Sequence, residues 1–133
     1  MDILKLDTKA QSNLTLQLFK ILENWYLEDI EQLKLLDLCG VIKPRHLCLY
    51  RNLYKSFDFD ERLIKRTEII LGISESLGTT FPINKEYGAI WLKRPVKKFK
   101  HKTPLEVMLS GDTGMMRVWY FLDCTQGWKD ELI

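Results

Sequence analysis

The stretch WLKRPVKKFKHKTPLEVMLSGDTGMMRVWYFLD, residues 91–123, decides the fold because it carries the clearest helix boundaries in the chain. Thr103 can cap a helix, Pro104 loses no needed backbone donor at the first helical position, and Glu106 can reach back to the cap amide. Gly111 is expected to end this short helix, and Asp112 to cap the next one. That last helix carries apolar residues at helical spacing, namely Met116, Val118, Trp119, Phe121 and Leu122.

On either side of these two helices, glycine and proline mark further helix ends. Gly127 is expected to stop the last helix. Asn84 can cap a short helix that runs through Trp91 and Leu92, and Pro95 ends that helix because proline disfavours helical geometry at the residue before it. We therefore expect a helix between residues 84 and 92.

A long central helix is expected to precede it. Asp58 followed three residues later by Glu61 resembles a capping box, in which the two side chains satisfy exposed amides at a helix start. The helix should run to about Leu77, where Gly78 stops it. Its apolar stripe makes it the expected spine of the fold and consists of Leu63, Ile64, Ile70, Leu71 and Leu77.

Three shorter helices are expected in the first half, over Asn13–Trp25, from Glu28 to about Leu38, and from Pro44 to about Tyr54. Gly40 should lie at or just beyond the end of the second. Their inward-facing residues are expected to be Leu14, Leu18, Ile21, Leu22 and Trp25, then Ile30, Leu33 and Leu36, then Leu47, Tyr50 and Leu53. Because no stretch alternates with period two for long enough to form a strand, we expect an all-α protein of about seven helices, divided into residues 1–80 and 81–133.

Composition and charge narrow the class of protein. The 133 residues are 46% hydrophobic and 29% charged, which is typical of a globular chain. Twenty Lys and Arg against 18 Asp and Glu give a formal net charge of +2, so there is no global bias toward nucleic acid. No apolar run approaches the roughly 18 residues of a membrane span, and the N-terminus lacks the order of a signal peptide. We expect a cytoplasmic protein without a membrane partner.

The cysteines and histidines do not form a convincing chemical site. Cys39, Cys48 and Cys124 lack CxxC spacing and are interpreted as reduced, buried thiols. His46 lies near two of them, but a fourth zinc ligand is missing. Neither His46 nor His101 lies beside a nucleophile and an acid, and there is no Gly-rich phosphate loop. We therefore expect no enzyme, no metal and no cofactor.

The order of fixed positions between Trp91 and Val118 resembles the toxin-binding domain of the Xre/MbcA/ParS antitoxin family. The matching positions are Trp91, Leu92, Pro95, Phe99, Pro104, Leu105, Glu106, Gly111 and Val118, followed by Gly127 and Trp128. The first half is similar to the family's Xre-like helix-turn-helix region at Leu22, Trp25, Leu27, Asp29, Leu35, Leu36 and the segment Glu61–Leu77. The segment Cys39–Arg45 is longer than the compact turn of such motifs.

This resemblance implies an antitoxin whose partner is a RES-domain toxin that consumes NAD or, in some branches, attaches ADP-ribose to a cellular protein. In the family, the C-terminal domain covers the active-site cleft of the toxin and the terminal segment enters it, and residues Gln126–Ile133 hold that place here. Trp128 would anchor this segment, and Asp130 and Glu131 would meet cationic groups in the cleft. A homodimer formed through the first half and repression of the operon by binding its operator DNA are implied as well.

Two sets of candidate binding residues result. The toxin-binding set is Lys93, Arg94, Lys97, Lys98, Arg117, Trp128, Lys129, Asp130, Glu131, Leu132 and Ile133. The DNA-binding set is Arg45, His46, Tyr50 and Arg51, where a recognition helix would present side chains to a major groove.

Each feature also has a purely structural interpretation. In the functional interpretation, the basic cluster in residues 93–102 binds an acidic toxin surface or DNA phosphates. In the structural interpretation, the same residues form a solvated loop whose Phe99 folds into the core. The terminal segment is a plug or a frayed end. Tyr50 contacts DNA or belongs to the core, with the two arginines of its set solvated. Trp25, Trp91 and Trp119 lie on apolar stripes and are expected to be core residues rather than a ligand pocket.

The alternative to an antitoxin is a stand-alone helix-turn-helix transcriptional regulator, and a third reading is a protein-interaction adaptor. A RES-domain reading frame beside this one would separate the first from both others.

Overall fold

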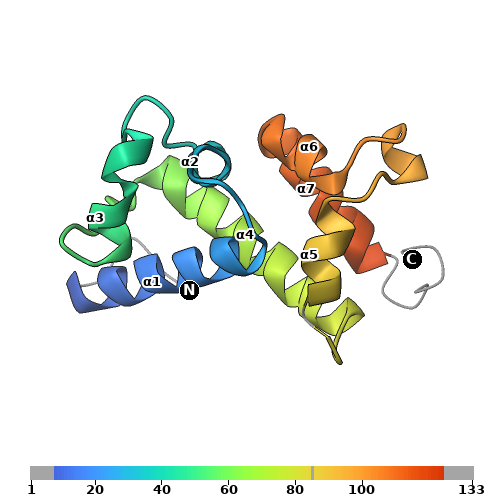
Figure 1. The fold of residues 1–133 in the computed structure, drawn as a ribbon, viewed down its shortest axis with the longest axis horizontal. Coiled ribbons are helices and arrows are strands. Elements are labelled where there is room, and N and C mark those ends of the chain that lie inside the picture. Colours follow the sequence, from blue (N-terminus) through green and yellow to red (C-terminus); the bar gives the residue numbers. More distant parts are fainter. Residues whose placement is uncertain (1–7, 85, 125–133) are drawn as a thin grey trace. The chain divides into compact units, whose positions relative to one another are not determined.

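The computed structural model of the chain describes residues 8–84 and 86–124. Over these residues the protein is all-helical, with seven α-helices, two 3₁₀ helices and no strand, which confirms the predicted fold class. The elements are α1 (Thr8–Asn24), α2 (Asp29–Leu36), η2 (Pro44–His46), α3 (Leu47–Arg51), α4 (Glu61–Thr80), α5 (Glu86–Leu92), η3 (Lys97–Phe99), α6 (Pro104–Leu109) and α7 (Asp112–Cys124) (Figure 1). None of the helices in these ranges combines the length and the apolar character that crossing a bilayer requires.

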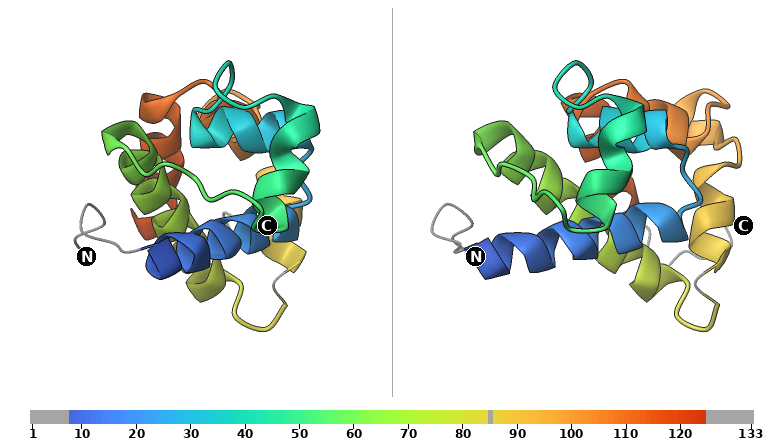
Figure 2. Two further views of the ribbon diagram at one scale, coloured as in Figure 1. Left: turned by 90° about the vertical axis from the view of Figure 1, so that its left-hand side faces the viewer. Right: turned by 60° about the vertical axis from the view of Figure 1, so that its left-hand side comes forward.

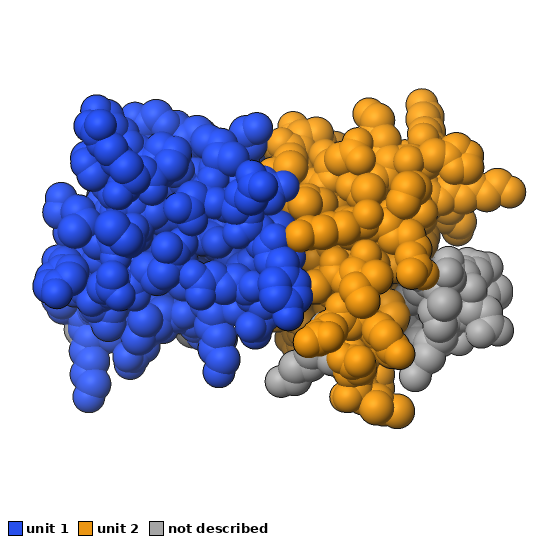
Figure 3. Space-filling model, in the orientation of Figure 1, with its two compact units in different colours: residues 1–68 blue, residues 69–133 orange. Residues whose placement is uncertain are grey.

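The chain divides into two compact units, unit 1 of residues 1–68 and unit 2 of residues 69–133 (Figure 3). The division falls inside α4, whereas the boundary expected from the sequence lies at the end of that helix. The cause is visible in the burial of the apolar side chains of α4: Leu63 belongs to the core of unit 1, and Ile70, Ile73 and Leu77 belong to the core of unit 2. One helix therefore contributes to two cores.

The core of unit 1 combines the apolar stripe of α1 with an aromatic group. Leu14, Leu18, Leu22 and Trp25 are buried as the helical spacing predicted. Helix α3 packs on α1 (Figure 2), and beyond α3 the Phe57 ring lies 5.2 Å from the rings of both Phe19 and Tyr50. Such aromatic pairs stabilise a fold beyond the area they bury. The loop before α4 is therefore a packed part of the unit.

Helix α2 buries Leu33 and Leu36 as predicted, but the prediction for Ile30 was wrong. Ile30 is exposed, and Gln32 occupies the inward position instead, with its Nε2 donating to the carbonyl oxygen of Leu27 at 3.0 Å. This hydrogen bond replaces water at Nε2, whereas Oε1 of the same amide is buried without a hydrogen-bond partner. The helix also ends earlier than expected, at Leu36, because Asp37 adopts a left-handed conformation with φ of 58°. Gly40 lies beyond it in the following loop.

Several other helix ends differ from the predictions. Helix α1 begins at Thr8, five residues before Asn13. The cap of α4 is Asp60 rather than Asp58, since its Oδ1 accepts from the Leu63 amide at 2.9 Å. Gly78 lies inside α4, which continues to Thr80.

Helix α3 is shorter than predicted. It ends at Arg51, and Leu53, which was expected to be buried, is exposed with φ of 62°. A left-handed residue cannot continue the helix, so the chain turns away before Tyr54.

The helix starts that the sequence predicted best lie in unit 2. The Glu106 amide donates to Thr103 Oγ1 at 3.1 Å, and the Glu106 side chain accepts from the Thr103 amide, so the capping box is confirmed. The Glu86 amide donates to Asn84 Oδ1 at 3.0 Å, which confirms the cap of α5. Asp112, predicted as a cap, is the first residue of α7, one position inside the helix.

Two close contacts hold α7 in unit 2. Helices α6 and α7 pack side by side (Figure 1), and Gly114 comes so near the Val107 carbonyl that a side-chain carbon there would lie 1.9 Å from its oxygen. The half-buried Trp119 packs its indole on Gly72 of α4, and one turn further Ser76 Oγ donates to Asp123 Oδ1 at 2.6 Å. Of the three tryptophans expected in the core, Trp25 and Trp91 are fully buried and Trp119 is half-buried.

The expectation of buried cysteines was wrong, because all three are exposed. Cys39 lies in the loop after α2, and Cys124 is the last residue of α7. Cys48 lies on the outward side of α3, where its thiol donates to the Arg45 carbonyl at 3.7 Å. The cysteines were predicted to be buried because their neighbours in the sequence are apolar. On a helix, however, those neighbours can occupy the inward side and leave the thiol exposed.

Candidate functional site

The positive charge of the chain is concentrated in one segment, residues 93–102 between α5 and α6, which we call the basic loop. These ten residues contain six Lys and Arg and no Asp or Glu. Residues 1–68 carry 11 basic and 11 acidic residues, and residues 69–133 carry nine and seven, so the net charge of 9 − 7 = +2 arises in unit 2. Six of the nine cations of that unit therefore lie in the basic loop.

The basic loop is folded rather than extended. The amide of Val96 donates to the Lys102 carbonyl at 3.0 Å, and the amide of His101 donates to the Val96 carbonyl at 3.1 Å. Phe99 is buried, which confirms the prediction that its ring folds back into the core. Lys100 and His101 have left-handed conformations with φ of 56° and 65°, each of which costs about 1–2 kcal/mol for a residue other than glycine. Packing and hydrogen bonds must offset this cost, so the lysines extend from a defined backbone.

An aromatic cluster of Trp91, Phe99 and Phe121 supports the loop. Phe121 of α7 stacks on Trp91 of α5 with ring centroids 6.0 Å apart, and it meets Phe99 at 5.2 Å. All three rings are buried. Trp91 and Phe99 are positions of the resemblance, whereas Phe121 was predicted only as an apolar residue of the last helix. Three elements of unit 2 thus meet in one apolar core.

Two cations lie over this cluster from different elements. Lys98 Nζ of the basic loop lies 5.9 Å from the centroid of Phe121, and Arg117 Cζ of α7 lies 5.6 Å from the centroid of Phe99. Cations within about 6 Å of a ring face are attracted by its quadrupole. The fold therefore brings Arg117, which is fifteen residues from the loop's end in sequence, to the surface that the loop presents.

Of the predicted toxin-binding residues, Lys93, Arg94, Lys97, Lys98 and Arg117 are all exposed in unit 2. The structure gathers Lys98 and Arg117 on one aromatic pair. The remainder of the set, Trp128, Lys129, Asp130, Glu131, Leu132 and Ile133, lies outside the described residues, as does Gly127.

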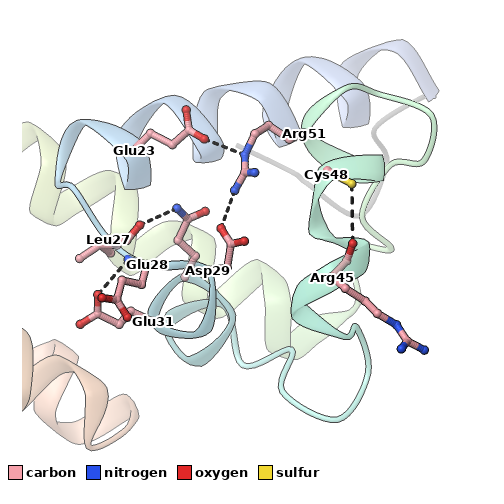
Figure 4. A network of polar contacts seen from close by, with 9 residues as sticks. Glu23, Leu27, Glu28, Asp29, Glu31, Arg45, Cys48 and Arg51 are labelled. Atoms are coloured by element: carbon pink, nitrogen blue, oxygen red, sulfur yellow. Dashed lines mark hydrogen bonds and ion pairs between the residues drawn. The ribbon is translucent and has the colours of Figure 1, made fainter.

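The predicted DNA-binding residues divide into two pairs. Arg45 and His46 are exposed on η2, and Figure 4 shows the Arg45 side chain pointing away from the helices. Tyr50 is half-buried and stacks on Phe57, which agrees with its structural interpretation. Seven residues, 37–43, separate α2 from η2, more than the three or four in the turn of a helix-turn-helix motif.

Arg51, expected on the surface, is instead half-buried and bound within unit 1. Its Nε lies 2.6 Å from Glu23 Oε1 of α1, and its Nη2 donates to Asp29 Oδ1 of α2 at 3.0 Å (Figure 4). Its Cζ also lies 5.3 Å from the centroid of the Phe19 ring. The side chain is 29% exposed and ties α3 to two other helices.

We expect Arg51→Ala to lower the free energy of unfolding by about 1–2 kcal/mol, because it removes two partly exposed ion pairs and a cation–π contact. Arg45→Ala, at an exposed position six residues earlier, is the matched control and should stay within about 0.5 kcal/mol of the wild type. Urea denaturation followed by circular dichroism measures both. Equal stabilities of the two variants would contradict a structural role for Arg51.

Unit 1 also contains a pocket of about 170 Å³ between the end of α2, the loop before α4 and the first turn of α4. Its lining includes Asp37, Asp60 and Arg62. Arg62 pairs with Asp37, and Asp60 caps α4, so these groups are already engaged. In the described ranges, no three His, Cys, Asp or Glu side chains are grouped so that they could hold a metal. The pocket defines no ligand chemistry.

Comparisons of the chain with protein-family models, with curated proteins and with solved structures found no match.

Proposed function

We propose that the chain is an antitoxin that binds and blocks a RES-type, NAD-consuming toxin through unit 2. Besides the sequence resemblance, one structural observation supports the proposal of an antitoxin. Of the apolar residues of the resembling pattern, Pro95 is exposed, and the others are buried in unit 2, namely Trp91, Leu92, Phe99, Pro104, Leu105 and Val118. The pattern therefore encodes a scaffold, and the cations of the basic loop are exposed around it.

The chemistry of the exposed residues fits a protein partner with an acidic surface. The basic loop contains six cations and no Asp or Glu, and this concentration of positive charge attracts such a surface and speeds the encounter. Neutralisation then needs only steric exclusion of the substrate from the toxin's cleft. Residues 126–133 lie outside the described residues. In the sequence they begin two positions after the last residue of α7, and they would supply the segment that enters the cleft.

Inhibition of the purified toxin tests this function. The partner is first sought as a RES-domain reading frame beside the one that encodes this chain. Its purified product is then incubated with NAD, with and without the intact chain, and with a variant that lacks residues 126–133. We expect the intact chain to stop NAD consumption. We expect the shortened chain to bind more weakly and to leave most of the activity, because the cleft stays open. An intact chain that neither binds nor inhibits this toxin would refute the proposed function.

Repression of the operon, the second part of the expected antitoxin role, would rest on Arg45 and His46. A mobility shift with the upstream promoter compares the wild type with an Arg45→Ala, His46→Ala double variant, and we expect the shift to disappear because phosphate contacts by cations dominate such binding. Arg51→Ala is unsuitable for this assay since that side chain stabilises unit 1. The absence of any shift with the intact chain would remove the repressor role and leave neutralisation untouched.

A further inference from the structure

The outward face of α7 is chemically unlike that of an ordinary solvated helix. Its inward residues are Gly114, Met115, Val118, Phe121 and Leu122, and its exposed residues are Thr113, Met116, Arg117, Tyr120, Asp123 and Cys124. At about 100° per residue, Met116, Arg117 and Tyr120 lie within one arc of about 100°. Met116 is 45% exposed and Tyr120 is 74% exposed.

Helix α1 of the same chain provides a comparison. Its exposed residues include one large apolar side chain, Leu16, among Lys9, Asn13, Gln17, Lys20, Glu23 and Asn24, so that face is predominantly polar, as expected of a solvated helix. On α7 the charged residues of that face are Arg117 and Asp123, and Asp123 accepts a hydrogen bond from Ser76 of α4. Met, Tyr and Arg are the residue types enriched at the centres of protein interfaces.

We propose that Met116, Arg117 and Tyr120, here called the α7 face, form the anchor of the interface with the partner, while the basic loop guides an acidic partner surface toward them. This inference rests on the proposed function, in which the partner is the RES-type toxin. The matching surface of the toxin is then an apolar depression that accepts the Met116 thioether and the Tyr120 ring, with carboxylates around its rim.

The α7 face and the basic loop form one continuous surface. Arg117 belongs to the α7 face and lies over Phe99 of the loop, while Lys98 of the loop lies over Phe121 of α7. The buried aromatic cluster beneath them fixes their relative positions. An anchor that is already ordered loses less conformational entropy on binding, which favours affinity.

Tyr120 is available as a neutral anchor. A hydrogen bond with the Cys124 side chain, together with the charge of that group, raises the pKa of Tyr120 above its ordinary value of 10.0. A phenol is protonated at neutral pH even at this ordinary pKa, and its ring can enter an apolar pocket with the hydroxyl group directed to a polar rim.

A protein partner fits this surface better than a nucleic acid. The cations of this surface are the six of the basic loop and Arg117, whereas the exposed residues beside Arg117 on the α7 face are Met116 and Tyr120, and the helix ends near the carboxylate of Asp123. A polyanion needs cations along its whole path, whereas a protein interface combines an apolar centre with a charged rim.

Binding kinetics separate the two roles. Association and dissociation of the intact chain and the purified toxin are followed by surface plasmon resonance over a series of salt concentrations. We expect Met116→Ala and Tyr120→Ala each to raise the dissociation rate about tenfold or more and to leave the salt dependence unchanged. Lys97→Gln with Lys98→Gln should lower the association rate several-fold and weaken its salt dependence, with little effect on dissociation.

Unit 1 offers matched controls. Leu16 is 42% exposed and Tyr54 is 80% exposed, so Leu16→Ala and Tyr54→Ala remove similar side chains at similar exposure and should leave the kinetics unchanged. Met116→Glu and Tyr120→Glu are second variants at exposed positions that should fold and should block the same depression by placing a charge in it. Thermal unfolding of each variant confirms that unit 2 remains folded.

The outcomes of these measurements distinguish a failure of the proposed function from a failure of the α7 anchor alone. No binding of the intact chain to the toxin refutes the proposed function and the α7 anchor with it. Tight binding that is unaffected by the changes at Met116 and Tyr120 refutes the anchor alone. Binding of a single-stranded oligothymidylate that Tyr120→Ala weakens, while toxin binding stays unchanged, would also overturn the inference and assign the face to nucleic acid.

Discussion

Gly114→Ala is expected to unfold unit 2 or to destabilise it by about 3 kcal/mol or more. The new methyl carbon would lie 1.9 Å from the Val107 carbonyl oxygen and 2.4 Å from Ser110 Oγ. A backbone oxygen cannot rotate away as a flexible side chain can, so α6 and α7 must separate. Their separation would uncover the fully buried Met108 and Val118. Overpacking of this kind exceeds the usual cost of about 1–3 kcal/mol, because the clash is with backbone.

Gly78→Ala is the matched control for this substitution. Gly78 also lies in a helix of unit 2, and no atom lies within 4 Å of the position that a side-chain carbon would take. Alanine there should stabilise α4 by about 0.5–1 kcal/mol through its higher helix propensity. Urea denaturation followed by tryptophan fluorescence and circular dichroism measures both variants. Similar midpoints for Gly114→Ala and the wild type would disprove the close approach of α6 and α7.

The sequence predicted the start of a helix correctly where only one nearby residue could serve as its N-terminal cap. Thr103, Pro104 and Glu106 form the capping box that the sequence indicated, and Asn84 caps α5. Before α4, two aspartates compete, and the sequence indicated Asp58 because Glu61 lies three residues later. Asp60 is the cap in the structure, since its carboxylate reaches the Leu63 amide. Phe57 and Phe59 precede this helix start and are both buried, with ring centroids 6.3 Å apart, and this packing is not visible in the local sequence.

The face that a short helix buries was the least predictable feature. In α2, with only eight residues, an apolar pattern through Ile30 and a pattern through Gln32 fit the spacing almost equally well. The hydrogen bond from Gln32 to the Leu27 carbonyl, which only the folded chain offers, decides for the second. Single apolar residues are common at exposed positions, so the exposure of Ile30 could not be predicted from the sequence.

The candidate site was visible in sequence as charge but not as geometry. The basic loop stands out because six cations occur without a carboxylate, and Phe99 was expected in the core. The meeting of Phe99 with Phe121 and Arg117 depends on how α7 packs, which no spacing rule contains. Arg51 shows the same limit, because its partners Glu23 and Asp29 are 28 and 22 residues away.

Phe99→Ala is expected to destabilise unit 2 by about 3 kcal/mol and to release the basic loop. The substitution removes a buried ring that contacts Phe121, and such truncations cost about 3–5 kcal/mol, of which some is recovered because the loop can relax. Without the ring, the left-handed conformations of Lys100 and His101 lose the packing that offsets their cost. Hydrogen exchange should then show the His101 and Lys102 amides losing protection, since their acceptors belong to the same loop.

Phe99→Leu is the control that retains an apolar group of similar depth, and it should cost less than about 1.5 kcal/mol and keep both amides protected. If the loop is what guides the partner, Phe99→Ala should also slow association with the toxin, although every cation is still present. The reason is that lysines on a mobile segment no longer present a fixed pattern of charge to an acidic surface. Loop amides that stay protected in Phe99→Ala would mean that backbone hydrogen bonds alone order the loop, and the aromatic cluster would then lose its role in positioning Lys98 and Arg117.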